Sequence, residues 1–272
     1  MPRLALLLLL AAPAFAQAPA PSVPADWPTA QFAASKDPSV QKACLMLNDM
    51  IRALGGEAWL NVRDMQSEGR SYGFSHGQPN SLSILFWRFW QWPDKERVEL
   101  TKQRDVIELF NGDKGYEITY KGTATQDTKE MEDYLRRRDH SLEWVVRKWL
   151  PAQGTTILYS GTAMVERNLA DQITVLNSSD DSVTISIDGT TRLPVKIGYS
   201  WRDPLDRQFD DESVVFSNYK LIQGVETPYS IVRYKNGDMS NQRFVTGVTY
   251  NTNMAATLFE PKGLTYNQGK SK

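Results

Sequence analysis

Residue types that perform catalysis are few in this chain of 272 residues, and their spacing indicates no catalytic site. The chain has only two histidines, His76 and His140, so a three-histidine zinc site is excluded. Neither histidine has another histidine, a cysteine or a glutamate at metal-ligand spacing. The sequence contains no G-x-S-x-G elbow, no P-loop and no G-x-G-x-x-G turn after a strand. Since neither a nucleophile with its base nor a cofactor motif is present, we expect a protein that is not an enzyme and uses no cofactor.

Two further groups of potential metal ligands have simpler interpretations. Asp210, Asp211 and Glu212 lack the alternating spacing of a calcium loop, and we interpret them as a solvated turn between strands. Cys44 is the only cysteine, which excludes an intramolecular disulfide and a cysteine-based metal site. It lies on an apolar helical stripe, where a small buried side chain is expected. We therefore predict no metal site.

The charged residues argue against a nucleic-acid partner but leave one local surface to consider. The formal net charge is -1, so there is no basic excess for binding phosphate backbones. Arg136, Arg137 and Arg138 make the polar side of a predicted helix basic. Such a surface suits anionic head groups or a protein partner in the cell envelope, although an ordinary solvated helix face has the same composition.

An aromatic run is the most unusual feature of the sequence. Residues 84–92 read ILFWRFWQW, and a strand would place Phe86, Trp90 and Trp92 on one face and Trp87 and Phe89 on the other. Both faces are then apolar, whereas a sheet with one wet face alternates apolar and polar residues. The second face must be covered, either by another part of the chain or by an apolar ligand such as an acyl chain.

The first residues predict export across a bacterial inner membrane. A positive charge at Arg3 precedes an apolar stretch over residues 4–12, and Ala14-Phe15-Ala16 forms an A-x-A cleavage site. The stretch is shorter than the roughly 20 residues that a bilayer requires. We expect a signal peptide over residues 1–16, cleaved near Ala16, and a periplasmic mature chain with no transmembrane segment.

Hydrophobic periodicity predicts two main helices. Apolar residues recur at steps of three and four over residues 39–54 and again over residues 130–149. Most of the remaining chain reads as short strands separated by turns, among them Asn111-Gly112, a strong hairpin signal. Because few helices interrupt the strands, we predict an α+β fold: one large, curved antiparallel sheet with two or three helices packed on it.

The ends of the chain have a different composition from its middle. Residues 17–38 are rich in proline and alanine and suggest a flexible lead-in, and residues 266–272 suggest a disordered tail. A single domain is expected over residues 39–265.

Several short motifs resemble the superfamily of outer-membrane lipoprotein-sorting (LolA-like) proteins, in particular a broad bacterial branch other than the well-studied carrier. In chain order they are Leu54-Gly55-Gly56, Trp92-Pro93-Asp94-Lys95-Glu96-Arg97, Asn111-Gly112-Asp113-Lys114-Gly115-Tyr116, Thr246-Gly247-Val248-Thr249-Tyr250-Asn251 and Leu258-Phe259-Glu260-Pro261. The resemblance covers nearly all of the mature chain. It implies an unclosed antiparallel half-barrel whose concave face is covered by helices, with an apolar cavity that shields acyl chains in the periplasm.

The resemblance also implies which side chains would line such a cavity. By analogy of strand register they would be Phe86, Trp90, Trp92, Val98 and Leu100. We expect Phe110, Trp144 and Trp149 to line the same apolar cavity. The carrier has a basic residue before the proline of its strand-end motif, and Trp92 holds that position here. The resemblance therefore does not extend to ATP-coupled loading and release of lipoproteins.

Two functions are consistent with these features. The first is a periplasmic carrier or binding protein for lipid, the acyl chains of lipoproteins or another apolar ligand, supported by the aromatic run and the resemblance. The alternative is a periplasmic sensor or interaction module of the same fold, which binds a protein partner through Arg136, Arg137 and Arg138 rather than carrying cargo.

Overall fold

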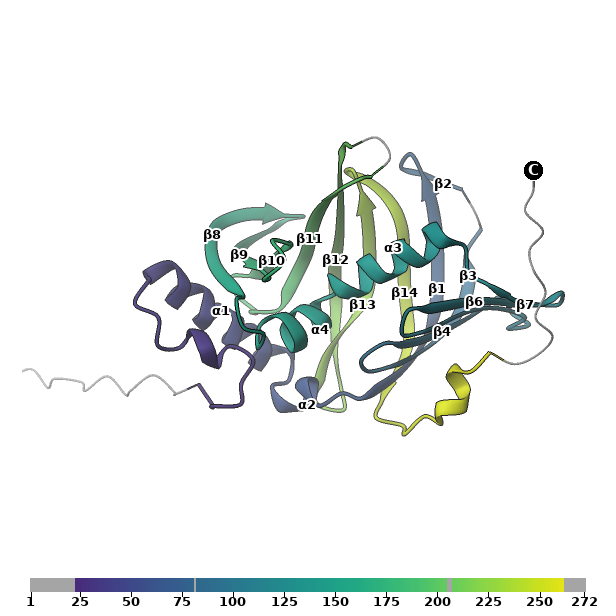
Figure 1. Cartoon of the computed structure of the whole chain (residues 1–272), viewed down its shortest axis with the longest axis horizontal. Coiled ribbons are helices and arrows are strands. Elements are labelled where there is room, and N and C mark those ends of the chain that lie inside the picture. The colour runs from purple at the N-terminus through teal and green to yellow at the C-terminus, as the bar shows by residue number, and fades with distance from the viewer. Residues whose placement is uncertain (1–22, 81, 205–206, 262–272) are drawn as a thin grey trace, which may run out of the picture.

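A single antiparallel sheet forms the body of the molecule in the computed structural model, which describes residues 23–80, 82–204 and 207–261. Fourteen strands of these residues belong to the sheet, and neighbours pair in the order β7-β6-β5-β4-β3-β1-β14-β13-β12-β11-β10-β9-β8, with β2 paired only to β1. The strands are β1 (Asp64–Ser75), β2 (Gln78–Pro79), β3 (Ile84–Gln91), β4 (Lys95–Leu100), β5 (Val106–Asn111), β6 (Lys114–Thr119), β7 (Gly122–Thr125), β8 (Thr156–Val165), β9 (Asn168–Leu176), β10 (Ser182–Asp188), β11 (Pro194–Arg202), β12 (Phe209–Ile222), β13 (Val225–Lys235) and β14 (Asp238–Tyr250). The predicted α+β fold, one large antiparallel sheet that is curved but not closed, is confirmed (Figure 1).

The connection from β7 to β8 determines where the second group of helices lies. These strands follow each other in the chain yet form opposite edges of the sheet. The chain between them crosses the sheet as α3 (Thr128–Asp139), α4 (Leu142–Trp144) and a π-helical turn (Val145–Trp149). Figure 1 shows α3 and α4 passing across the hollow of the curved sheet. We call this crossing segment, residues 128–149, the lid.

The lid is broken where the sequence predicted one continuous helix over residues 130–149. Helix α3 ends at Asp139, and Ser141 starts the next turn by accepting a hydrogen bond from the backbone N–H of Trp144 at 3.3 Å. The Ser141 hydroxyl also donates to the carbonyl of Arg138 at 2.7 Å. A serine hydroxyl competes with the backbone for helical hydrogen bonds, so this residue acts as a cap rather than as a position inside a helix.

Helix α1 (Pro38–Leu54) follows the prediction for residues 39–54 and is confirmed as an amphipathic helix. Asp37 caps it by accepting a hydrogen bond from the backbone N–H of Ser39 at 2.8 Å, and Gly55, at a φ of 123°, ends it. Its apolar face, which includes Cys44, packs against the strands at the β8 edge. A four-residue helix, α2 (Glu57–Leu60), follows. No helix in the described ranges is long and apolar enough to cross a bilayer.

Part of the proline-rich segment is packed rather than flexible. Among the described residues of the expected lead-in, Thr29 and Phe32 are buried, and Trp27 packs against the same core as α1. The hydroxyl of Thr29 donates to the side-chain oxygen of Asn48 on α1. Aromatic side chains in this segment bury enough apolar surface to offset the cost of ordering it. The predicted signal peptide and tail lie outside the described residues.

The two apolar faces of β3 are covered by different parts of the chain. The strand's even-numbered residues face the hollow beneath the lid, and the odd-numbered residues face the convex side. On the convex side, Phe89 and Leu109 pack against Phe259 of the C-terminal 3-10 helix η3 (Ala256–Phe259). The second face is therefore covered by another part of the chain, which is one of the two options that the sequence left open.

Candidate functional site

A cavity of about 290 Å³ lies between the concave face of the sheet and the lid. Side chains from β3, β4 and β5 form one wall, those from β11 to β14 form the opposite wall, and α3 and α4 contribute the roof. The cavity exists because the β7–β8 crossover has to pass over a sheet that curves away beneath it. The side chains that line the cavity are of two kinds, aromatic and charged.

Aromatic side chains form the wall near the lid. Trp92 lies between Trp90 and Trp144, with ring centroids 6.1 Å and 5.8 Å away. Phe110 on β5 stacks on Tyr134 of α3 with the ring planes 5° apart. Such edge-to-face and stacked contacts combine a large apolar surface with a defined geometry. This part of the cavity suits an apolar group such as a hydrocarbon chain.

Charged side chains also line the cavity, although the sequence predicted apolar walls. We call the charged groups on the strands beneath the lid the floor. Arg88 on β3 pairs with Glu96 on β4 at 2.6 Å. Burial opposes the ionisation of both groups, but their mutual attraction outweighs it, lowering the pKa of Glu96 and raising that of Arg88. Glu108 on β5 lies in the same cavity, and burial raises the pKa of its carboxyl. The cavity is therefore amphiphilic: aromatic and ionic side chains line it together, and the ionic ones come both from the sheet and from the lid, which contributes Arg137 and Arg138.

Two more cations face the cavity from the other half of the sheet, Arg233 on β13 and Arg243 on β14. Burial together with the nearby guanidinium groups of Arg137 and Arg243 lowers the pKa of Arg233 to about 9. Burial and Arg88 also lower the pKa of Arg243. The Nε atom of Arg233 is buried and has no hydrogen-bond partner among the described residues.

The predicted cavity residues fall into two groups. The structure brings Trp90, Trp92, Val98, Phe110 and Trp144 together around this cavity. The remaining three lie elsewhere. Phe86 and Leu100 face each other across β3 and β4 outside the lining, and Trp149 is buried in the core beside His140, with ring centroids 5.4 Å apart. A role for the first group in binding stays a prediction.

The three lid arginines do not form the single exposed surface that their sequence suggested. Arg136 pairs with Asp133 at 2.7 Å and lies over the ring of Trp201 at 4.3 Å. Arg137 and Arg138 line the cavity instead, and Arg138 also donates to the carbonyl of Gly112 at 3.0 Å. All three are half-buried, since α3 lies against the sheet rather than standing free of it.

Sequence reasoning missed the ionic floor altogether. Arg88 was visible as one charged residue within the aromatic run, and its parity placed it on the face of Trp90. Its partner Glu96 lies at the matching parity of the next strand. Arg233 and Arg243 carried no comparable signal, because they reach the cavity only through the pairing of β1 with β14.

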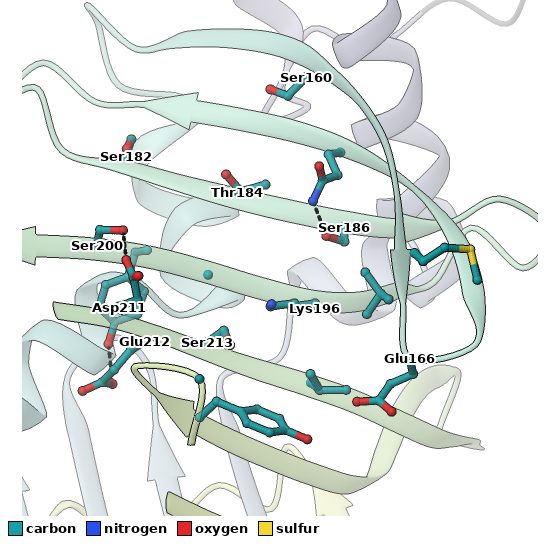
Figure 2. A pocket seen from close by; sticks show the side chains of 18 residues that line it. Ser160, Glu166, Ser182, Thr184, Ser186, Lys196, Ser200, Asp211, Glu212 and Ser213 are labelled. Carbon is teal, nitrogen blue, oxygen red and sulfur yellow. Dashed lines mark hydrogen bonds between the residues drawn. The ribbon is translucent and has the colours of Figure 1, made fainter. Parts of the chain in front are cut away.

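A second hollow, of about 710 Å³, lies at the strands of the other half of the sheet and has a different character. Figure 2 shows hydroxyl side chains along these strands, such as Ser182, Thr184 and Ser186 on β10. Some are satisfied locally: Gln172 donates to Ser186 at 3.4 Å, and Ser200 to Asp211. With few apolar groups in its lining, this hollow does not suit a hydrocarbon chain.

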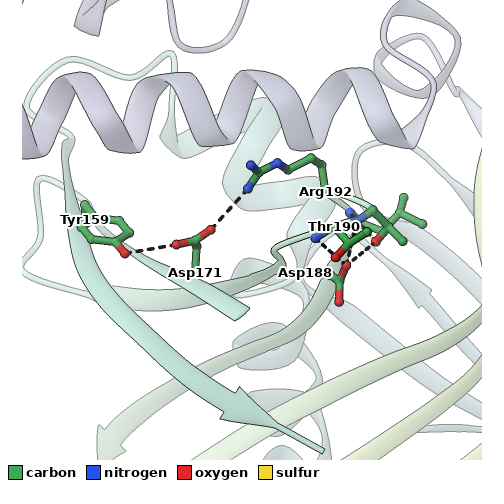
Figure 3. Close-up of polar contacts among 7 residues, drawn as sticks. Tyr159, Asp171, Asp188, Thr190 and Arg192 are labelled. Carbon is green, nitrogen blue, oxygen red and sulfur yellow. Dashed lines mark hydrogen bonds and ion pairs between the residues drawn. The ribbon is translucent and has the colours of Figure 1, made fainter. Parts of the chain in front are cut away.

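A polar network links β8, β9 and the turn that follows β10. Tyr159 donates to Asp171 at 3.1 Å, and Arg192 binds the other oxygen of that carboxylate at 3.3 Å (Figure 3). Nearby, Asp188 accepts hydrogen bonds from the turn that follows β10. In the described ranges, no three histidine, cysteine, aspartate or glutamate residues are arranged to hold a metal ion.

Comparison with known proteins identifies the fold. No protein-family model matches the sequence, and no curated protein matches it. The structure is similar to that of a DUF1329 family protein from Desulfovibrio piger, with a TM-score of 0.56 and 12% identity over 80% of this chain and 97% of that one. It is also similar to a domain assigned to the outer membrane lipoprotein-sorting proteins from Vibrio parahaemolyticus, with a TM-score of 0.51 and 9% identity over 80% and 96% of the two chains.

The chain shares the fold of these two solved structures. At these identities the likeness extends to the fold alone, so it confirms the architecture that the sequence motifs implied. The shared fold is a curved antiparallel sheet, and the side chains that line the cavity are those of this chain.

Proposed function

We propose that this protein is a periplasmic carrier or binding protein that holds a lipid or the acyl chain of a lipoprotein beneath its lid. The observation that carries the proposal is the cluster of Trp90, Trp92 and Trp144 at the wall of the cavity beneath the lid. Ligand sites are concave and mostly apolar, with a few polar groups that orient the ligand, and this cavity has both. The fold likeness and the predicted signal peptide, which delivers the chain to the periplasm, are in agreement with it.

Part of the lid is held by polar contacts that water can replace, whereas Val145 and Trp149 at its C-terminal end are buried in the core. Arg147 donates to the carbonyl of Val62 at 2.9 Å, and its guanidinium lies 3.8 Å from the ring centroid of Trp92. Arg138 donates to the carbonyl of Gly112 at 3.0 Å. Half-exposed polar contacts of this kind each contribute only about 1 kcal/mol. A ligand enters and leaves when the lid separates from the sheet at these points.

The alternative of a partner-binding module has less support. It depended on Arg136, Arg137 and Arg138 acting as one surface, and two of these side chains are turned toward the cavity. Their positive charge is available to something inside the cavity rather than to a flat protein surface.

The proposal is tested by analysing what the exported protein carries. The chain, produced with its own N-terminus in a bacterium and purified from the periplasm, is examined by native mass spectrometry, followed by solvent extraction. We expect a lipid or fatty acid in stoichiometric amount. Recovery of an empty protein that also fails to bind a fluorescent fatty acid would contradict the proposal.

A pair of variants on β3 provides the matched comparison. Trp90 faces the cavity, whereas Trp87 lies on the opposite face of the same strand, under the guanidinium of Arg104. We expect W90A to weaken fatty-acid binding about ten-fold or more, the effect of losing one buried aromatic contact. W87A should leave binding unchanged. Equal effects of the two substitutions would show that the loss is one of stability rather than of ligand contact.

A further inference from the structure

Two arginines on the concave face lack the partners that such groups usually have. Arg243 on β14 lies opposite Ile231 on β13, and Arg233 is two residues further along β13, so the two guanidinium groups are diagonal neighbours on one face. Both line the cavity, and neither makes an ion pair or a side-chain hydrogen bond among the described residues. Arg137 faces them from α3.

The nearby carboxylates do not neutralise this cluster. Glu96 is engaged by Arg88 at 2.6 Å, and Glu212 accepts a hydrogen bond from Tyr199 at 2.8 Å. Glu108 forms no ion pair with any described residue, and burial raises the pKa of its carboxyl, which favours the neutral acid. Among the described residues, six arginines and four glutamates line the cavity, so positive charge is in excess.

Unpaired cations facing each other destabilise a folded protein unless an anion joins them. Burial and the repulsion of neighbouring guanidinium groups both disfavour the charged forms of Arg233 and Arg243, and both effects lower their pKa values. A guanidinium binds a carboxylate or a phosphate through two parallel hydrogen bonds, and these bonds are roughly twice as strong as neutral ones. The arrangement is thus complementary to an anionic group with at least two oxygen atoms.

We infer that Arg233 and Arg243, assisted by Arg137, bind the carboxylate or phosphate head of an anionic amphiphile whose tail lies against Trp90, Trp92 and Trp144. This inference rests on the proposed function and narrows its ligand class from any apolar molecule to an acidic lipid. It also orients the ligand, with the head on the half of the sheet formed by β13 and β14 and the tail toward β3 and the lid.

The test compares ligands that differ only in their head groups. The exported protein is stripped of bound lipid and titrated calorimetrically with decanoate, decyl phosphate, 1-decanol, decylammonium and inorganic phosphate. We expect the two anionic amphiphiles to bind at least about ten-fold more tightly than the alcohol, as one charge-assisted hydrogen-bonded pair would provide. Decylammonium should bind more weakly than the alcohol, and inorganic phosphate should compete poorly because it has no tail.

Two variants test whether the preference for anionic head groups depends on Arg233 and Arg243. The double variant R233Q/R243Q should bind decanoate no better than 1-decanol, while its affinity for 1-decanol stays within about two-fold of the wild type. The matched control is R167Q, the same change at an exposed turn between β8 and β9. If the double variant does not fold, the comparison of head groups on the wild-type protein still decides the question.

The outcomes separate the two proposals. Equal binding of acid and alcohol to the wild type overturns the inference but leaves the proposed function standing. Inorganic phosphate competing as strongly as decyl phosphate also overturns it, since the site would then bind a free anion. If neither the acids nor the alcohol bind at all, the proposed function itself fails.

Discussion

Arg88 lies between two aromatic residues of β3, and its charge is tolerated because Glu96 meets it across the strand pair at 2.6 Å. A buried ion pair of this kind adds little net stability, but removing one partner leaves the other charge uncompensated. Such a pair is therefore typical of a site that needs fixed charge in a partly dry environment. On the same floor, Arg233 and Arg243 form no ion pair among the described residues, and in our proposal they bind a ligand instead.

Asp188 permits a prediction at the scale of a single residue. Its carboxylate accepts hydrogen bonds from the backbone N–H groups of Thr191 at 2.7 Å and Thr190 at 3.0 Å, and these bonds lower its pKa (Figure 3). We expect D188N to lower the free energy of unfolding at pH 7 by about 1 kcal/mol, because charge-assisted bonds near the surface are partly screened. Urea denaturation followed by fluorescence measures it.

The pH dependence of this effect has a definite sign. Because the folded pKa of Asp188 is depressed, its contribution is fully present above the unfolded pKa of about 3.9 and is lost as the pH falls through the folded value. The difference between wild type and D188N should therefore shrink below about pH 4. D238N, at the exposed first residue of β14, is the control. A difference that stays constant down to pH 3 would contradict the assignment.

At the scale of elements, two short helical segments determine what the two faces of β3 contact. The lid encloses the concave face because the β7–β8 connection must cross the sheet. The C-terminal helix η3 seals the convex face through Phe259, which is completely buried. The aromatic run thus serves two purposes at once: Trp87 and Phe89 belong to a small core on the convex side, and Arg88, Trp90 and Trp92 line the cavity.

Phe259 provides the prediction at this scale. We expect F259A to reduce the free energy of unfolding by about 3–5 kcal/mol, the usual cost of removing a buried phenylalanine. The matched control is F209A, because Phe209 is 72% exposed, and its loss should change stability by less than about 0.5 kcal/mol. Chemical denaturation measures both variants. A small effect of F259A would mean that η3 does not stay docked on the sheet.

At the scale of the whole molecule, the pairing of β1 with β14 unites the two halves of the sheet. The first half contains β3 to β7 and the second contains β8 to β13, and these two strands are their common boundary. Their register brings Arg88 and Arg243 into one cavity, although the residues are far apart in the chain. The cavity chemistry therefore depends on a contact between the beginning and the end of the domain.

A substitution at Gly69 tests the junction between the two halves of the sheet, which is the pairing of β1 with β14. Gly69 lies at a register shift between β1 and β14, where a Cβ atom would stand only 2.1 Å from the carbonyl oxygen of Phe244. We expect G69A to lower the free energy of unfolding by about 3 kcal/mol or more and to abolish fatty-acid binding. G198A, on β11, is the control, since its added Cβ would meet atoms at 3.4 Å or more. If G69A folds and binds normally, the junction tolerates a side chain and this account of it is wrong.

Several elements were predictable because their signals are local. The amphipathic periodicity of α1, the Asn111-Gly112 turn between β5 and β6 and the aromatic strand β3 all follow from neighbouring residues. Strand β1 was not predicted because most of its side chains are polar and show no clear alternation of apolar and polar residues. The break at Ser141 was missed because a cap competes with helical periodicity over a single residue.

By itself the sequence determined the type of fold and the presence of aromatic side chains suited to an apolar ligand, since both depend on patterns along the chain. Only the tertiary structure decided which of those side chains meet, and it placed Phe86, Leu100 and Trp149 outside the cavity. It also brought Arg233 and Arg243 beneath the lid, through pairing between strands distant in sequence. The physical reason is that strand order and register set the chemistry of a cavity, and neither is encoded in any local stretch of residues.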